Sequence, residues 1–403
     1  MSRMEELLAR LSSNNVPRVR LGDITFEGTE RNVTREYTEV RSVTNSRGLV
    51  RTSDYFDNTR TSADTKGYKV VRPGMYVYNP SRINVGSIGW LDEPEPTVVS
   101  PMYVVFGVDT ARVSSPYLGL YLSSSAGRRQ IAGKTEVGAR FRLTYASLSS
   151  ISFPLPSVAI QNEIVQVLGA FTSLAGSLQA ELEARRLQYA FYRDSLLSFP
   201  ETSQVRRVPM GELGRFIRGR RFTKDDIVEV GIPSIHYGEI YTHYGVSARS
   251  TLSHVRSELA DQLRFAEPGD VVIAAVGETV EDVAKAVAWV GGERVAIHDD
   301  TFLFRSDLDP TYVSYFMQTA DFHSQKNKYV ARAKVKRLSG ESLAKIQIPV
   351  PSLDERERIV SILDKFDALV NDPSMGLPAE IAARRKQFEY YRNRLLTFEE
   401  AAA

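Results

Sequence analysis

The sequence contains no cysteine, and this absence excludes disulfide bonds and metal sites built from thiolates. It also lacks an apolar run of the roughly 18–20 residues that a membrane helix needs, and its start lacks the apolar core of a signal peptide. The first half contains no histidine, and the spacing of the five in the second half fits no metal motif: His236, His243, His254, His298 and His323. We therefore expect a cytoplasmic protein without a membrane segment or a bound metal.

Neither sign of charge dominates the chain. The 51 Lys and Arg residues are nearly balanced by 49 Asp and Glu residues, which leaves a net charge of +2. Charge alone therefore does not indicate a nucleic-acid partner. With 403 residues and 42% hydrophobic content, the chain has the composition of a soluble protein of about two to three domains.

Two segments come close to catalytic or cofactor motifs and miss them. Gly127–Thr135 resembles a P-loop, but its first glycine is one residue too early and no apolar strand precedes it. Asp309–Tyr312 resembles the motif that holds an amino group for methylation, but its second proline is missing and no glycine-rich cofactor loop accompanies it. A helix start is the better interpretation of Asp309–Tyr312. We expect a non-catalytic protein that binds no cofactor itself.

What the sequence does contain is a long internal repeat. Phe153–Ser157 and the apolar residues after it recur 195 positions later, beginning with Ile348–Ser352. After a four-residue insertion the match resumes at an offset of 199, where Tyr391-Arg392 corresponds to Tyr192-Arg193. A period near half the chain length is too long for a solenoid. It predicts two modules, each a variable body followed by a near-constant helical tail.

The bodies and the tails differ in hydrophobic pattern. Short apolar runs broken by turn signals predict strands at 68–71, 75–78, 102–106, 271–276 and 301–304, and a helix is expected at 310–321. In 158–198 and 359–398 the apolar residues are mostly three and four apart, which predicts long helices. Asn371–Pro378 interrupts the second tail, and Pro378 suits the first turn of a resumed helix. These patterns indicate an α+β fold.

Basic loops at matching places in the two bodies are the first candidate DNA-binding segments. Arginine and amide side chains can recognise base edges, while lysine neutralises phosphate. A solvated charged loop is the alternative for either segment alone, but recurrence favours DNA contact. The candidates are Arg128, Arg129, Gln130, Lys134, Arg140 and Arg142 in the first body, and Lys326, Lys328, Arg332, Lys334, Lys336 and Arg337 in the second. A weaker candidate in 78–84 comprises Tyr78, Asn79 and Arg82, although this segment equally suits a turn with an Asx cap.

Taken together, these motifs resemble the specificity subunit of type I restriction–modification systems, the HsdS family. The likeness covers essentially the whole chain and rests on Ile348–Leu353, Ile359–Asp367 and Tyr391–Phe398 with their counterparts in the first half. One departure is Arg356, which stands where the family usually has a glutamine such as Gln161. The resemblance implies two β-rich target-recognition domains separated by two long antiparallel coiled-coil helical regions with pseudo-two-fold symmetry.

The resemblance also implies the domain bounds. They are an N-terminal helix that completes the repeat (1–17), target-recognition domain 1 (18–150), conserved helical region 1 (151–204), target-recognition domain 2 (205–345) and conserved helical region 2 (346–403).

A non-catalytic subunit that recognises a bipartite double-stranded DNA target is the function implied. It would join two methyltransferase (M) subunits and the restriction/translocase (R) subunits, and S-adenosylmethionine, ATP and Mg would be bound by those partners. The apolar tail residues expected to contact the M subunits are Ile164, Leu168, Phe171, Tyr192, Ile359, Leu363, Phe366 and Tyr391. The alternatives are a recognition subunit of another methylase-type defence system and a two-domain scaffold that does not bind DNA.

Overall fold

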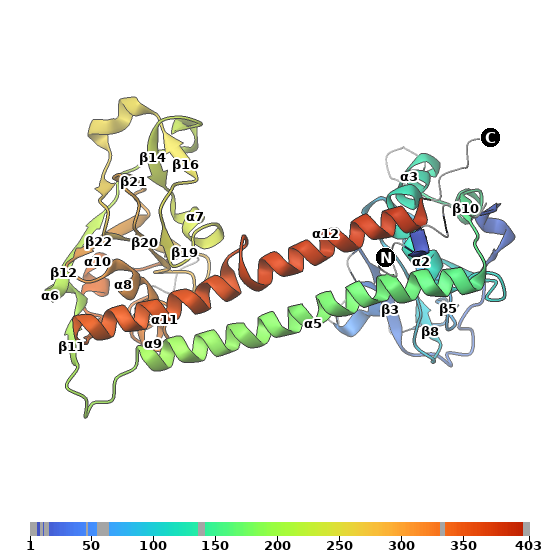
Figure 1. The fold of residues 1–403 in the computed structure, drawn as a ribbon, viewed down its shortest axis with the longest axis horizontal. Helices are drawn as coiled ribbons and strands as arrows, with labels where there is room; N and C mark the ends of the chain where they lie inside the picture. Colours follow the sequence, from blue (N-terminus) through green and yellow to red (C-terminus); the bar gives the residue numbers. More distant parts are fainter. Residues whose placement is uncertain are drawn as a thin grey trace. The chain divides into compact units, whose positions relative to one another are not determined.

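The computed structural model describes residues 6–8, 11, 16–45, 47–54, 64–135, 142–330 and 335–397. The chain divides into two compact units, of which unit 1 joins Met1–Ser177 to Ile381–Ala403 and unit 2 comprises Leu178–Glu380. The helix α5 (Val158–Leu196) begins in unit 1 and ends in unit 2, while α12 (Gly376–Leu396) begins in unit 2 and ends in unit 1. Helices and strands are mixed in both units (Figure 1), which confirms the α+β class.

Two four-stranded sheets form the body of unit 1. The first has the order β2-β9-β6-β7 and consists of Thr25–Glu27, Val104–Val108, Tyr76–Tyr78 and Ile88–Trp90. The second has the order β4-β3-β8-β5 and consists of Gly48–Arg51, Val40–Thr44, Thr97–Val99 and Lys69–Val71. The strands predicted at 68–71, 75–78 and 102–106 are confirmed as β5, β6 and β9.

Short helices pack against the first sheet of unit 1. They are α2 (Ser115–Ser123), α3 (Ser125–Lys134) and α4 (Tyr145–Ser149), with the 3-10 turns η1 (Leu21–Asp23), η2 (Thr52–Asp54) and η4 (Ile83–Val85). The core between sheet and helices is rich in aromatic side chains, and the rings of Tyr76 and Phe106 stack with centroids 5.1 Å apart. Such pairs add about 0.5–1.5 kcal/mol to the free energy of apolar burial.

Unit 2 is built on two five-stranded sheets. The first, β12-β22-β18-β20-β15, consists of Gly214–Arg218, Thr301–Ser306, Val271–Ala274, Ala286–Trp289 and Ser247–Ala248. The second, β13-β16-β14-β21-β17, consists of Ile227–Val228, Ser253–Val255, Ile232–Ile235, Val295–Ile297 and Phe265–Ala266. A smaller pair joins β19 (Val276–Gly277) to β23 (Lys336–Arg337). The run predicted as one strand at 271–276 is therefore split between β18 and β19.

The helices of the unit 2 body are short. They are α6 (Met210–Leu213), α7 (Tyr237–Thr242), α8 (Pro310–Phe316), α9 (Ala320–Lys326) and α10 (Gly340–Ala344), with the 3-10 turns η5 (Lys224–Asp226) and η6 (Ser257–Gln262). Asp309 caps α8, because its carboxylate accepts the backbone N–H groups of Thr311 and Tyr312 at 2.7 and 3.0 Å. The interpretation of Asp309–Tyr312 as a helix start is confirmed.

The same hydrogen bonds recur in the two units at the repeat offset. The Gln130 side-chain amide donates to the Ser152 carbonyl at 2.7 Å and accepts the Ser152 N–H at 3.0 Å. Gln325 makes the same two hydrogen bonds with Gln347, at 2.9 and 2.8 Å, and we call each such pair of bonds a clamp. These clamps hold the pairs β1 (Arg18–Arg20) with β10 (Ser152–Pro154) and β11 (Arg206–Pro209) with β24 (Gln347–Val350). The sequence repeat is therefore a repeat of structural contacts, and it forms a common frame at the start of each helical tail.

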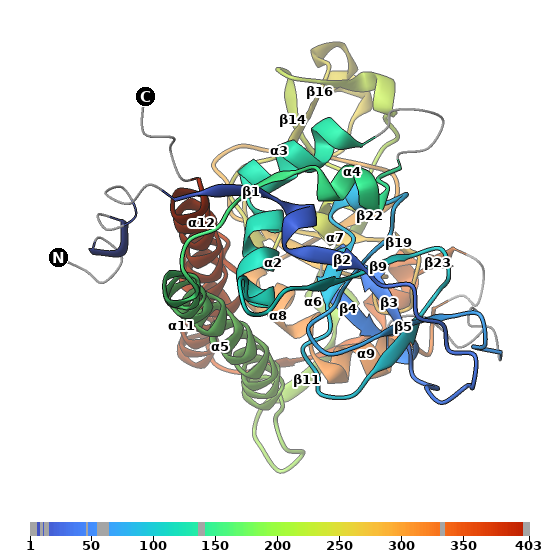
Figure 2. The ribbon, with the colours of Figure 1, turned by 90° about the vertical axis from the view of Figure 1, so that its right-hand side faces the viewer.

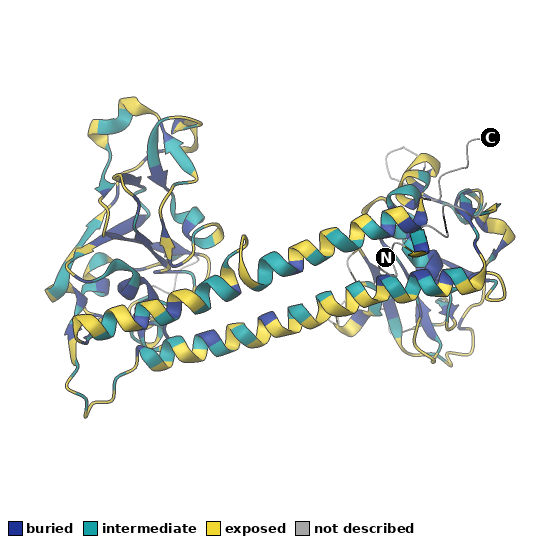
Figure 3. Cartoon of the chain, viewed as in Figure 1, coloured by how far each residue is buried: buried dark blue, intermediate teal, exposed yellow. Residues whose placement is uncertain are grey.

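The tails are helical as predicted. The helix α11 (Leu353–Asn371) follows Ser352, whose hydroxyl accepts the Glu355 N–H at 3.3 Å. It ends at Asn371, the first residue of the predicted interruption, and α12 begins at Gly376, whose φ of +67° a glycine adopts without strain. Pro378 lies in the first turn of α12, as expected. Buried, partly buried and exposed residues alternate along all three helices (Figure 3).

Candidate nucleic-acid interface

The first basic segment of unit 1 is helical up to Lys134 and not a loop there, so the loop prediction is wrong for that part. The Ser124 hydroxyl accepts the Gly127 N–H at 3.1 Å and starts α3, whose sequence contains no proline to stop it. Arg128, Arg129 and Lys134 are exposed on this helix, which carries no acidic residue. They present uncompensated positive charge along one short element.

The other members of the first segment divide differently. Gln130 has both ends of its amide engaged in the Ser152 clamp and a further bond to the Tyr121 hydroxyl, so it is not available to read bases. Arg142 is exposed just before α4. Arg140 lies outside the described residues.

The weaker candidate segment 78–84 is a turn with an Asx cap. The Asn79 side-chain oxygen accepts the Ser81 N–H at 3.0 Å, while the Tyr78 ring is fully buried and its hydroxyl donates to the Leu143 carbonyl at 3.1 Å. Burial raises the pKa of the Tyr78 phenol, so it stays protonated. Ser81, Arg82 and Asn84 are the exposed residues of this segment and could contact a ligand.

The two candidate segments of the first body meet at one cavity of about 760 Å³. Ile83 and Asn84 of η4 line one side and Arg128 of α3 lines another. Arg47, Trp90 and the acidic Asp92 also line it, and the sequence patterns did not single out any of them. For Arg47, the sequence offers one local signal, the turn-forming residues around it. The position of Trp90 at the cavity follows only from the pairing of β7 with β6.

One cation of the second basic segment lies in the interior of unit 2 and not at its surface. Lys326 is fully buried and donates from its ammonium to the backbone carbonyls of Glu281, at 3.1 Å, and Val283. Burial lowers its pKa to about 8. This side chain does not offer its charge to a duplex, and we do not carry it further as a DNA contact.

Other cations of this segment are at the surface or outside the described residues. Lys328 is exposed after α9, and Lys336 is partly exposed on β23. Arg337 is exposed and lies 3.6 Å from the Asp300 carboxylate. Arg332 and Lys334 fall outside the described residues.

A cavity of about 930 Å³ in unit 2 corresponds to the cavity in unit 1. Lys285 and His323 line it, and each lies 195 positions after a residue of the first cavity, Trp90 and Arg128. The second cavity is also lined by Asp364, Asp367 and Asp372 at or beyond α11. The frame is thus repeated, whereas the side chains that give each surface its charge have diverged.

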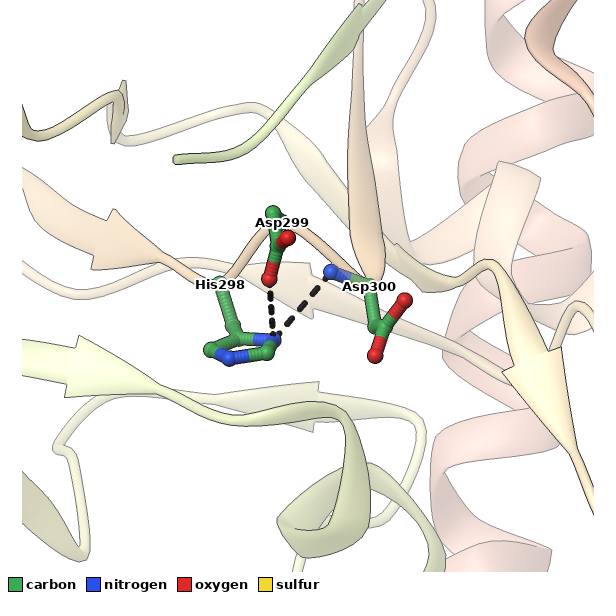
Figure 4. A group of neighbouring side chains, drawn as sticks. All are labelled: His298, Asp299 and Asp300. Atoms are coloured by element: carbon green, nitrogen blue, oxygen red, sulfur yellow. Dashed lines mark hydrogen bonds and ion pairs between the residues drawn. The ribbon is translucent and has the colours of Figure 1, made fainter. Parts of the chain in front are cut away.

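A histidine group stands at the turn between β21 and β22 (Figure 4). His298, Asp299 and Asp300 hold donor atoms close enough for one metal ion. However, His298 Nδ1 accepts the Asp300 N–H at 3.1 Å, and its Nε2 lies 3.1 Å from the Phe222 carbonyl, to which it can donate. Both ring nitrogens are therefore used within the protein, and the group fits a turn-stabilising role better than a metal site.

Acid should destabilise unit 2 through its histidines. Burial lowers the pKa values of both His236 and His323 to about 4, from 6.5. Both are neutral in the folded state, whereas the unfolded chain takes up protons as the pH falls from 6.5 towards 4. Each therefore reduces the free energy of unfolding over that window, on the order of 1–3 kcal/mol by pH 4, and the contribution is intact above pH 6.5.

Calorimetric unfolding between pH 7.5 and 4.5 measures this loss. The double variant His236→Asn, His323→Asn is the control, since asparagine at 236 can still accept the Gly238 N–H that His236 Nδ1 binds at 3.1 Å. We expect the variant to lose less stability on acidification than the wild type. Equal losses would contradict the assignment.

The apolar residues of the tails lie mainly inside the chain. Ile164 and Leu168 are fully buried in the core of unit 1, and Ile359 and Leu363 are fully buried in unit 2. The remaining predicted contact residues form ring pairs, with centroids 5.6 Å apart for Phe171 with Tyr391 and 5.4 Å apart for Tyr192 with Phe366. These side chains therefore pack mainly against other residues of the same chain.

Other apolar tail residues face outward. Leu187, Phe191 and Tyr390 are 75%, 66% and 55% exposed. No described helix combines the length and the apolar content of a bilayer span.

Comparison with known proteins places these features in a family. Residues 201–383 match the model for the type I restriction modification DNA specificity domain. A putative type I restriction enzyme specificity subunit from Haemophilus influenzae is 30% identical over 315 residues, which cover 74% of this chain and 75% of that protein. The EcoR124I/EcoR124II specificity subunit from Escherichia coli is 28% identical over 385 residues, 87% of this chain and 90% of the relative.

Solved structures share the fold. A chain from a structure of a type I R-M system aligns with a TM-score of 0.63 at 15% identity, covering 95% of this chain and 99% of that one. The HsdS subunit from Thermoanaerobacter tengcongensis aligns with a TM-score of 0.50 at 16% identity, covering 96% and 98%.

Proposed function

This chain belongs to the family of type I restriction–modification DNA specificity subunits, and from that premise we propose that each of its two units recognises one half of a bipartite DNA target. Subunits of this family are non-catalytic and work with M and R subunits on DNA. The methyl donor, ATP and Mg then belong to those partners. Neither alternative, a subunit of another defence system or a scaffold that does not bind DNA, is favoured.

The repeated frame is the observation that supports two recognition domains. Equivalent clamps and strand pairs hold residues 18–150 and 205–345 at the start of their tails, while the charged side chains on the two bodies differ. A repeated frame that carries two different surfaces suits two domains that recognise two different DNA sequences. The proposed domain bounds are 1–17, 18–150, 151–204, 205–345 and 346–403.

The tails would set the distance between half-sites. We place 151–204 and 346–403 in an antiparallel coiled coil with pseudo-two-fold symmetry, supported by the aromatic pairs in both units. The same symmetry would present one binding face to each of two M subunits. Exposed apolar residues such as Leu187 and Phe191 are candidates for that face, because water-exposed apolar patches are commonly interaction sites.

In unit 1 the DNA-facing residues would be the exposed cations Arg47 and Arg128, which line the cavity, together with the exposed Arg82, Arg129, Lys134 and Arg142. In unit 2 we retain Lys328, Lys336 and Arg337. Arginine can bind a guanine edge through two hydrogen bonds, and each good bidentate contact contributes about 1–3 kcal/mol of discrimination. Lysines would mainly contact phosphates.

Methylome sequencing tests the proposal. A host that expresses this chain with its M subunit should methylate one bipartite motif, two short half-sites separated by bases of any sequence. A host with the M subunit alone should lack that motif. Methylation of a continuous motif, or a motif independent of this chain, would contradict the proposal.

A further inference from the structure

Arg392, near the end of α12, is a buried arginine without a counter-ion among the described residues. It is 8% exposed, and its Nε has no hydrogen-bond partner there. Its guanidinium lies over the Phe388 ring, 5.4 Å from the centroid. A buried charge without a paired anion is costly, so this position is suited to gain stability when an anion arrives.

A second guanidinium, that of Arg128, belongs to the same place. The start of α3 lies close to the end of α12 (Figure 2). The Ser125 N–H donates to the Asn393 side-chain oxygen at 3.0 Å. Arg128 is the fourth residue of α3 and is exposed. Burial, and then the charge of Arg128, lower the pKa of Arg392, while Glu389 partly offsets them. The two cations repel each other in the free protein.

Unit 2 has the same arrangement with its charge neutralised. Arg193, the counterpart of Arg392, donates from Nε and Nη2 to one Asp194 carboxylate oxygen at 3.0 and 2.9 Å. Asp194 also lies where Asn393 does, since its other oxygen accepts the Ala320 N–H at the start of α9 at 3.3 Å. His323 replaces Arg128, and burial lowers its pKa to about 4, so it is neutral at pH 7.

We propose that Arg128 and Arg392 of unit 1 together bind one phosphate of the DNA backbone, and that the matching place in unit 2 does not. The proposal rests on the DNA-recognition function above and adds the helical tail to the DNA-binding surface of one unit. Two guanidiniums offer several N–H donors to phosphate oxygens, the anion that arginine binds best together with carboxylate.

A duplex fits this site better than a single carboxylate of a protein partner. Arg129 and Lys134 extend the positive charge along α3, and the helix has no acidic residue. A row of cations suits a polymer with a charge about every 1.7 Å along its axis. The site would therefore contribute affinity to one half-site without contributing sequence preference.

The substitution Asn393→Asp tests the proposal without removing either arginine. Aspartate can still accept the Ser125 N–H, as Asp194 accepts the Ala320 N–H in unit 2, and it supplies a carboxylate counter-ion to Arg392. We expect the log–log salt slope of DNA binding by the complex with the M subunit to fall by about 0.9, as for one lost phosphate contact. Between 50 and 200 mM salt, affinity would then drop about 3.5-fold less than in the wild type.

Two further variants keep the test decisive. Arg128→Gln, an exposed substitution, should reduce the slope similarly, whereas Asp194→Asn in unit 2 should not reduce it. Unchanged slopes for both Asn393→Asp and Arg128→Gln would overturn the proposal. So would weakened binding of the M subunit at an unchanged slope, which would assign the anion to a carboxylate of that partner.

The wild-type complex separates the two levels of inference. If it binds DNA with sequence preference and the variants match it, only the phosphate site fails. If it shows no preference for any sequence, the proposed function fails first, and the phosphate site with it.

Discussion

Exchanging residues 18–150 for the corresponding body of a relative should replace one half of the methylated motif and leave the other half unchanged. The reason is that the body is held by a frame that recurs in unit 2: the Gln130 clamp on Ser152 and the pairing of β1 with β10. Base contacts specify sequence, so an exchanged surface should carry its own half-site with it. Methylome sequencing of a host with the chimera and its M subunit measures the result.

The design of the chimera matters for this experiment. The donor body should keep a glutamine at position 130 and a tyrosine at position 117, whose hydroxyl donates to the Pro154 carbonyl at 3.2 Å. The reciprocal exchange of residues 205–345 is the matched control, and it should change the other half-site. A chimera in which both halves of the motif change would refute independent recognition by the two units.

Leu168→Ala and Leu363→Ala should each destabilise the unit that contains them by about 2–5 kcal/mol, because both side chains are fully buried and alanine leaves a cavity. For a unit of this size we expect a decrease in melting temperature of about 4–20 °C. The two leucines occupy the same place in the repeat, so comparable losses in unit 1 and unit 2 would show that the two tails use it equally. Thermal unfolding measures the loss.

Leu187→Ala is the matched control on the same helix α5. Leu187 is 75% exposed, so its truncation should change the free energy of unfolding by no more than about 0.5 kcal/mol. We expect it to weaken association with the M subunit, measured by titration of that subunit against the labelled chain. Weaker association caused by Leu168→Ala at a temperature where it is fully folded, with none from Leu187→Ala, would reverse the assignment of the two faces.

The sequence by itself determined the two-module plan and the family. Periods of three and four in 158–198 predict α5 because a helix of 3.6 residues per turn places those side chains on one face. The interruption at Asn371–Pro378 likewise separates α11 from α12. Repeats and periodicities of this kind are properties of the linear sequence, so they can be recognised without knowledge of tertiary contacts.

The tertiary structure decided which of the chemically equivalent side chains are available. Lys326 and Lys328 are two residues apart and carry the same group, yet one is buried against backbone carbonyls and the other is exposed. Gln130 is a candidate for base recognition by residue type, but its amide oxygen and nitrogen are both hydrogen-bonded to Ser152. Arg392 gained its significance only when α3 and α12, distant in sequence, met at Asn393. Burial and pairing depend on contacts between remote segments, and the free energy of a charge depends on both.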